Sequence, residues 1–238
     1  MTIWLRRLLP LAPLLLLTSC LLSPGKFTST LDIRADRSFS FTYQGELIAS
    51  SDPGSSISSS VTEDSSTDSA TSGEDKTPAK PKDSSPGKDE DAKLRAIADA
   101  LAKEEGFRSA RYVGGRKFLI DYAISGRLDH GFVFPFNIDA QAVFPFLAIE
   151  LRKDGKVRVQ APGFANASEK GGGMGSGMGS GMDDSAKALD GSFTLTTNAE
   201  IISQNQEDGA TDSPRGKQIV WKVNSLTKTA PMAILRFK

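Results

Sequence analysis

Two low-complexity segments interrupt this chain and limit how much of it can form a hydrophobic core. Residues 49–89 hold thirteen serines and no aromatic side chain, and residues 166–188 include a run of Gly, Ser and Met. Such compositions bury too little apolar surface to offset the entropy lost on ordering, so we expect two disordered inserts. The remaining stretches, 26–48, 90–165 and 189–238, suffice for one domain of about 150 residues, which buries roughly 70% of its unfolded surface.

Most of the apolar pattern in these stretches has the two-residue period of β-strands. A hairpin is predicted around residues 34–37, and two more at the turn pairs Gly114-Gly115 and Asp154-Gly155, which tolerate positive φ. Nine segments have this strand character, and from them we expect a sheet of about seven or eight strands: Phe27–Ile33, Ser38–Ile48, Arg111–Val113, Lys117–Ile124, Phe146–Leu151, Lys156–Gln160, Phe193–Ile202, Gln218–Val223 and Ala233–Phe237.

One segment has the period of an α-helix instead. Leu94, Ile97, Ala98 and Leu101 form one apolar stripe, acidic residues precede it, and Gly106 follows it as a stop signal. A single amphipathic helix has to cover part of a sheet. The predicted class is therefore α+β, with a mainly antiparallel sheet of about seven or eight strands in a single domain over residues 26–238.

Cys20 is the only cysteine, and it closes a run of Leu17, Thr18, Ser19 and Cys20 that follows two arginines and a short apolar stretch. This arrangement resembles the bacterial lipobox, in which cleavage leaves an acylated cysteine as the first residue. We expect a signal peptide over residues 1–19, lipid on Cys20 and an acylated tether over residues 20–25. A membrane-spanning helix would need about 20 apolar residues, whereas this stretch is about half as long and carries two prolines.

The expected partner of the N-terminus is therefore a membrane, reached through acyl chains such as palmitate. We expect the protein in the cell envelope, and on the outer membrane facing the periplasm if the host has two membranes, because Leu21 rather than Asp follows the cysteine. Removing residues 1–19 takes away two of the 29 basic residues and none of the 29 acidic ones. The charge is nearly balanced, so nucleic acid is not an expected partner.

The residue types that carry metal or hydrolytic chemistry are scarce. His130 is the only histidine, and no free cysteine would accompany it in a zinc site. Met174, Met178 and Met182 are spaced for Cu⁺ ligation, but we interpret them as part of a flexible Gly-Ser loop. We therefore expect no metal, no cofactor and no enzymatic activity.

The C-terminal third carries a resemblance to a known family. Gly191–Ile201, then Glu207-Asp208-Gly209, then Gly216–Trp221 resemble the end of the LppM-type bacterial lipoprotein domain, where an asparagine after a strand, a glycine turn and a tryptophan strand recur. The resemblance implies an α+β domain similar to the BON module, displayed on the envelope, with lipid or glycolipid as the ligand class. No C-terminal membrane helix is visible in this sequence, unlike in some members of the family.

Five phenylalanines within fifteen residues form the first candidate site: Phe132, Phe134, Phe136, Phe144 and Phe146. Proline interrupts both halves of this segment, so we expect loops or edge strands there. The rings either plug one end of the sheet as core or form an apolar rim that takes an acyl chain or a partner's side chains.

A secondary candidate is a basic patch around the Gly114-Gly115 turn, formed by Arg108, Arg111, Arg116 and Lys117. Such a patch suits lipid headgroups or acidic polysaccharide. The alternative is a solvated hairpin tip whose charges discourage edge pairing.

Taken together, the sequence predicts an envelope lipoprotein whose domain binds an apolar or lipid-like ligand or a membrane component. The alternative is a structural or assembly factor that binds another envelope protein through a sheet edge. A hydrolase ranks third, because His130 has no evident nucleophile beside it.

Overall fold

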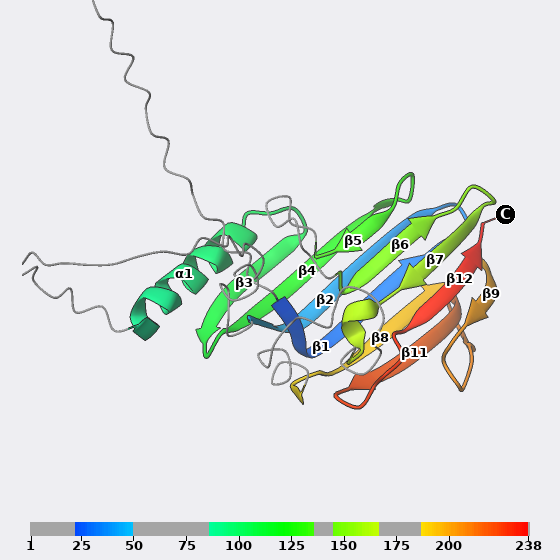
Figure 1. Ribbon diagram of the computed structural model, residues 1–238. Helices are drawn as coiled ribbons and strands as arrows, with labels where there is room; N and C mark the ends of the chain where they lie inside the picture. The colour runs from blue at the N-terminus through cyan, green and yellow to red at the C-terminus, as the bar shows by residue number, and fades with distance from the viewer. Residues whose placement is uncertain (1–21, 50–85, 136–144, 167–186, 238) are drawn as a thin grey trace, which may run out of the picture.

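The computed structural model describes residues 22–49, 86–135, 145–166 and 187–237. Within these residues, twelve strands form two sheets that lie one over the other, and a helix lies beside them (Figure 1). The seven-stranded sheet has the order β10-β11-β8-β1-β2-β4-β3, and the five-stranded sheet has the order β5-β6-β7-β12-β9. The elements are β1 (Leu22–Ile33), β2 (Ser38–Ala49), α1 (Pro86–Leu101), β3 (Phe107–Gly114), β4 (Lys117–Arg127), β5 (Phe132–Phe134), β6 (Leu147–Leu151), β7 (Lys156–Gln160), the 3₁₀ turn η2 (Pro162–Phe164), β8 (Asp190–Thr197), β9 (Glu200–Gln204), β10 (Thr211–Ser213), β11 (Gly216–Asn224) and β12 (Met232–Arg236).

The predicted α+β class with mainly antiparallel pairing is confirmed. The hairpins β1–β2, β3–β4 and β6–β7 form where the turn residues predicted them. The described residues hold more strands than the seven or eight expected, and these are shared between two sheets. One pairing is parallel, because β1 lies beside β8 with Lys26 opposite Asp190 and Ile33 opposite Thr197.

The stretch predicted as one strand over residues 193–202 is two strands in different sheets. β8 ends at Thr197 in the seven-stranded sheet, and β9 begins at Glu200 in the five-stranded one. Asn198 holds the crossing in place, since its Oδ1 accepts a hydrogen bond from the backbone N–H of Ala35 at 2.7 Å. The Thr197 hydroxyl accepts another from the N–H of Ala199 at 3.0 Å. The chain breaks here because of contacts with the β1–β2 turn, which lies far away in the sequence.

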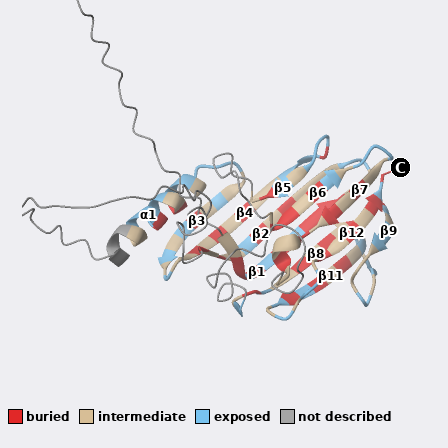
Figure 2. Ribbon diagram, viewed as in Figure 1, coloured by how far each residue is buried: buried red, intermediate tan, exposed pale blue. Residues whose placement is uncertain are grey.

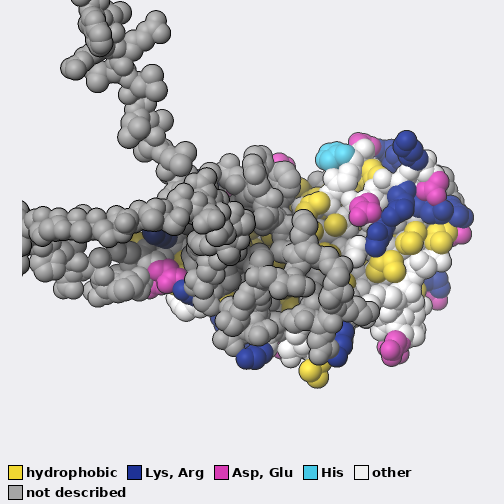
Figure 3. Space-filling model, in the orientation of Figure 1, with side chains coloured by type: hydrophobic (Ala, Val, Ile, Leu, Met, Phe, Trp, Pro, Cys, Tyr) yellow, Lys and Arg dark blue, Asp and Glu magenta, His cyan; other side chains and the backbone are white. Residues whose placement is uncertain are grey.

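The core fills the space between the two sheets (Figure 2). Alternate residues of β1, β2, β4, β8 and β11 point inward and are buried, as the strand period requires. The rings of Phe41 and Tyr43 meet that of Phe134 at centroid distances of 5.0 and 5.3 Å. On the outer face of the five-stranded sheet, Glu150 is paired with Arg152 and Arg158 at 3.6 and 3.9 Å. Figure 3 shows such charged side chains interleaved with apolar ones.

Helix α1 packs along β3 and buries Leu94 and Ala98, as its apolar stripe predicts. Its first residues, 86–89, fall inside the segment expected to be disordered, so that prediction is wrong at this end. The Tyr112 hydroxyl donates a hydrogen bond to Asp91, and Arg116 pairs with Glu90 at 2.6 Å. None of the helices among the described residues has the length and apolar character needed to cross a membrane.

The two predicted inserts fall mostly outside the described residues. Their boundaries are narrower than expected where the structure describes them, since Ala49 is the last residue of β2 and Asn166 bonds to the β11–β12 loop. The predicted tether over residues 20–25 is also shorter, because β1 already begins at Leu22.

Candidate functional site

The five phenylalanines of the first candidate site do not share one environment. Phe134 and Phe146 are core residues, each 1% exposed. Phe132 lies in the edge strand β5 and packs on Phe41 at a centroid distance of 5.7 Å. Phe136 and Phe144 lie outside the described residues. Of the two roles left open by the sequence, the structure gives Phe134 and Phe146 the role of core.

The basic patch is partly neutralised by neighbouring acids. Arg116 pairs with Glu90 at 2.6 Å, and Lys117 pairs with Glu46 at 3.0 Å. Arg108 and Arg111 are exposed on β3. These four side chains therefore surround the β3–β4 hairpin, where two of them also hold the helix and β2 in place.

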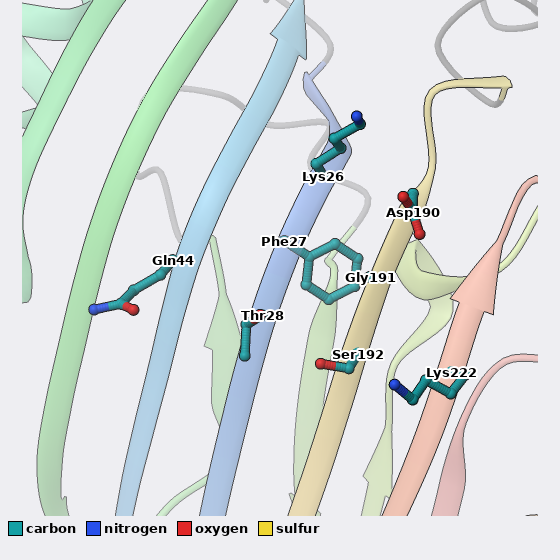
Figure 4. A pocket seen from close by; sticks show the side chains of 8 residues that line it. All are labelled: Lys26, Phe27, Thr28, Gln44, Asp190, Gly191, Ser192 and Lys222. Atoms are coloured by element: carbon teal, nitrogen blue, oxygen red, sulfur yellow. The ribbon is translucent and has the colours of Figure 1, made fainter.

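A shallow depression of about 450 Å³ lies on the outer face of the seven-stranded sheet. We call it the polar dish. It spans β2, β1, β8 and β11 near the ends of these strands that lie beside the start of β1 (Figure 4). Its lining residues are Lys26, Phe27, Thr28, Gln44, Asp190, Gly191, Ser192 and Lys222.

Strand register arranges the polar groups of the dish in two rows. Lys26 lies opposite Asp190, and Thr28 lies opposite Ser192, which in turn lies opposite Lys222. Residues two apart on a strand share a face, so all five side chains belong to the outer, solvent-facing side of the sheet. In Figure 4 the Lys222 amine points toward Ser192.

A bulge in β1 sets the position of Lys26. The β1–β2 register shifts between Pro24 and Phe27. Any Cβ on Gly45 would lie 2.3 Å from the carbonyl oxygen of Lys26, so only glycine lets the two backbones approach this closely. The extra residue of a bulge loses its ladder bond and is turned relative to its neighbours. Here the N–H of Lys26 donates instead to Glu46 Oε2 at 3.2 Å.

Glu46 links the dish to the β3–β4 hairpin. Its partial burial acts to raise the pKa, but the hydrogen bonds from the Lys117 ammonium and the Lys26 amide outweigh it, and the pKa of Glu46 is lowered. The side chain is therefore a carboxylate at neutral pH that fixes both Lys117 and the backbone of Lys26.

The floor of the dish is closed by aromatic packing beneath the sheet. The Phe27 ring lies under Gly191 and stacks on Phe164 and Tyr43 at centroid distances of 4.4 and 5.3 Å. Because this space is filled, a ligand in the dish would rest on the sheet surface.

The chemistry of the dish is that of a binding site for a polar group. Two ammonium groups, two hydroxyls and the Gln44 amide offer donors, and Asp190 offers an acceptor. Among the described residues, Lys26 and Lys222 belong to none of the ion pairs within 4.0 Å. A phosphate beside the lysines, with a hydroxyl or amine beside Asp190, would satisfy these groups.

The other residues singled out from the sequence are placed apart from the dish. His130 is exposed in the loop between β4 and β5. Cys20 and the three spaced methionines lie outside the described residues. Lipidation of Cys20 therefore stays a prediction.

The dish residues were not among the sequence-based candidates. A signal for them exists in the alternation of polar residues along Lys26, Thr28 and Thr30, and in a glycine between Asp190 and Ser192 inside a strand. That signal becomes specific only when β1 and β8 are known to be neighbours.

No protein-family model matches this chain, and no curated protein matches it either. A solved structure that matches is the NMR structure of the folded domain of LppM from Mycobacterium tuberculosis, with 12% sequence identity and a TM-score of 0.31. The match covers 92% of this chain and 92% of that chain.

Proposed function

We propose that this chain is a cell-envelope lipoprotein, anchored through acyl chains on Cys20, whose domain binds the polar headgroup of a membrane component in the polar dish. The observation that carries the proposal is the position of the dish. It surrounds Lys26, six residues after Cys20 and at the end of the sheet where β1 begins. The dish therefore lies at the end of the domain where β1, the strand that follows Cys20 in the sequence, begins.

The burial pattern favours a headgroup over an acyl chain as the bound part. Phe134, Phe146 and Phe164 are each at most 1% exposed and fill the space between the sheets. The dish instead offers Lys26 and Lys222, and basic pockets next to a membrane bind lipid headgroups. We therefore propose a binding role, with a phosphate-bearing lipid or glycolipid as the ligand class.

The experiment is native mass spectrometry of the full-length acylated protein after gentle extraction in mild detergent. We expect a non-covalent adduct with the mass of a phospholipid or glycolipid. The double variant Lys26→Gln/Lys222→Gln should lose this adduct. The matched control Lys103→Gln/Lys153→Gln, which removes two exposed lysines outside the dish, should keep it.

An adduct that survives in Lys26→Gln/Lys222→Gln would show that the dish is not the binding site. The absence of any lipid adduct, together with a stoichiometric protein partner, would favour the assembly role instead. One feature supports that second candidate, since β9 is an edge strand of the five-stranded sheet and its Ile202 is 38% exposed. A partner strand would pair there by β-augmentation.

A further inference from the structure

The ends of five strands of the seven-stranded sheet define one edge of the domain, which we call the anchor end. Ser23 of β1 lies opposite Ile48 of β2, and Ile48 lies opposite Lys117 of β4. On the other side of β1, Lys26 lies opposite Asp190, which lies opposite Asn224 at the end of β11. The β3–β4 turn and the β11–β12 loop therefore flank the start of β1 (Figure 1).

The β11–β12 loop at this end displays a leucine to solvent. Leu226 is 81% exposed, the highest value among the exposed large apolar side chains of the described residues. Hydrogen bonds fix the conformation of this loop. The N–H of Leu226 donates to Asn224 Oδ1 at 2.9 Å, and the N–H of Thr227 donates to the Asn224 carbonyl at 3.0 Å. Asn166 adds a bond from its N–H to the Thr227 carbonyl at 2.7 Å. A closed hydrogen-bonded turn thus holds this leucine outward.

A second apolar side chain is exposed at the β3–β4 turn. Val113 is 48% exposed. It comes just before the turn residues Gly114 and Gly115, both at positive φ, and the Arg116 carbonyl accepts a bond from the N–H of Ala49 at 2.9 Å. The turn is therefore fixed to the end of β2, beside the first residues of β1.

Leu226 and Val113 lie on opposite sides of β1, at a similar level along the strand direction. β11 is two strands from β1 and β3 is three strands from it, which corresponds to about 10 and 14 Å at the usual spacing of strands. Through the strand register, Val113 lies level with Ser23 and Pro24 of β1. Asn224 of β11 lies level with Lys26, and Leu226 comes two residues after it. Cys20 precedes Leu22, the first residue of β1, by two residues in the sequence.

The charge around these two side chains suits an anionic surface. Lys26, Lys222 and Arg111 are exposed at this end together with one acid, Asp190, while Glu46 and Glu90 are each paired with a basic side chain. Basic residues close to a membrane of anionic lipids are attracted to its negatively charged surface. Exposed apolar side chains enter the boundary between headgroups and acyl chains.

We propose that the anchor end is a membrane-docking surface, in which Leu226 and Val113 enter the interface of a phospholipid bilayer on either side of the acylated N-terminus. The inference rests on the anchoring part of the proposed function. In this orientation β1 rises directly from the bilayer, and the polar dish opens beside the headgroup layer.

The test uses the full-length acylated protein in liposomes of phosphatidylethanolamine and phosphatidylglycerol. The Cys20 thiol is consumed by lipid, so an introduced cysteine is the site of labelling with an environment-sensitive dye. Leu226→Cys and Val113→Cys report on the anchor end. Lys153→Cys, exposed in the β6–β7 turn near Phe237 at the opposite end, is the control.

We expect blue-shifted emission and strong quenching by nitroxide-labelled lipids at positions 226 and 113, and neither at position 153. Labels at 226 and 113 that behave like the label at 153, on protein that still floats with the liposomes, would overturn docking and leave the anchor in place. Protein that does not float with the liposomes would overturn the anchor and docking together. If Lys26→Gln/Lys222→Gln loses the lipid adduct but the quenching at positions 226 and 113 is unchanged, headgroup binding in the dish and membrane docking are independent of each other, and docking stands.

Discussion

Phe27 and Gly191 face each other across the parallel β1–β8 ladder, and a Cβ atom on Gly191 would lie 2.5 Å from Cδ1 of Phe27. The same atom would lie 2.7 Å from the carbonyl oxygen of Phe27, which is backbone and cannot rotate away. The missing side chain at position 191 therefore lets the Phe27 ring close the floor of the polar dish and stack on Phe164.

We predict that Gly191→Ala destabilises the domain by about 1–3 kcal/mol, because the Phe27 ring and the β1 backbone have to move. Urea unfolding of the variant measures this. Gly126→Ala is the matched control, since its Cβ would meet Phe39 at 3.6 Å, an ordinary contact. Equal stability of the two variants would show that β1 and β8 are not packed as closely as described.

Truncation of the buried phenylalanines should act on stability. Phe134 meets Tyr122 and Phe41 at centroid distances of 4.6 and 5.0 Å, so we expect Phe134→Ala to cost about 3–5 kcal/mol and to lower the thermal midpoint sharply. Val133→Ala, on the exposed side of the same strand, should change the free energy of unfolding by less than about 0.5 kcal/mol. A mild effect of Phe134→Ala on stability would contradict its role as a core residue and favour a role in contacting a ligand.

The lowered pKa of Glu46 predicts a specific pH dependence. The carboxylate stabilises the folded state through Lys117 and the Lys26 amide, and this contribution is fully present above the unfolded pKa of about 4.3. It is lost as the pH falls through the lower pKa of the folded state. The gap in unfolding free energy between the native chain and Glu46→Gln should therefore narrow as the pH is lowered from 6 toward 3.

Asp129→Asn removes an exposed ion pair with Arg127 and serves as the control for that titration. Exposed ion pairs contribute about 0–1 kcal/mol to stability. The free energy of unfolding of Asp129→Asn should therefore stay close to that of the native chain at every pH. A gap for Glu46→Gln that stays constant across the acidic range would contradict the assignment of the lowered pKa.

The parts of the fold that the sequence predicted are those with local causes. Turn residues such as Gly114-Gly115 and Asp154-Gly155 join strands that pair with their neighbours in sequence, and the Leu94–Leu101 stripe defines the helix. The pairing of Lys26 with Asp190 joins residues that lie far apart in the sequence, and no local pattern encodes it. The dish depends on this pairing and so could not be predicted from the sequence. The phenylalanine-rich segment was predicted as the site instead.

The break between β8 and β9 has the same kind of origin. A continuous run from Phe193 to Ile202 has good strand character, but Asn198 bonds to Ala35 and directs the chain into the other sheet. Likewise, the exposure of Leu226 follows from a turn closed by Asn224 and by Asn166, which comes from another part of the chain.

The most direct test of headgroup binding in the polar dish is the reactivity of its two lysines in the native acylated protein. Mass spectrometry after brief acetylation would compare protein extracted with its lipid and the same protein after delipidation. We predict that Lys26 and Lys222 are protected several-fold in the lipid-loaded protein and regain reactivity after delipidation, while the exposed Lys103 and Lys153 react equally in both. Equal reactivity of Lys26 and Lys222 in the two samples would contradict headgroup binding in the dish.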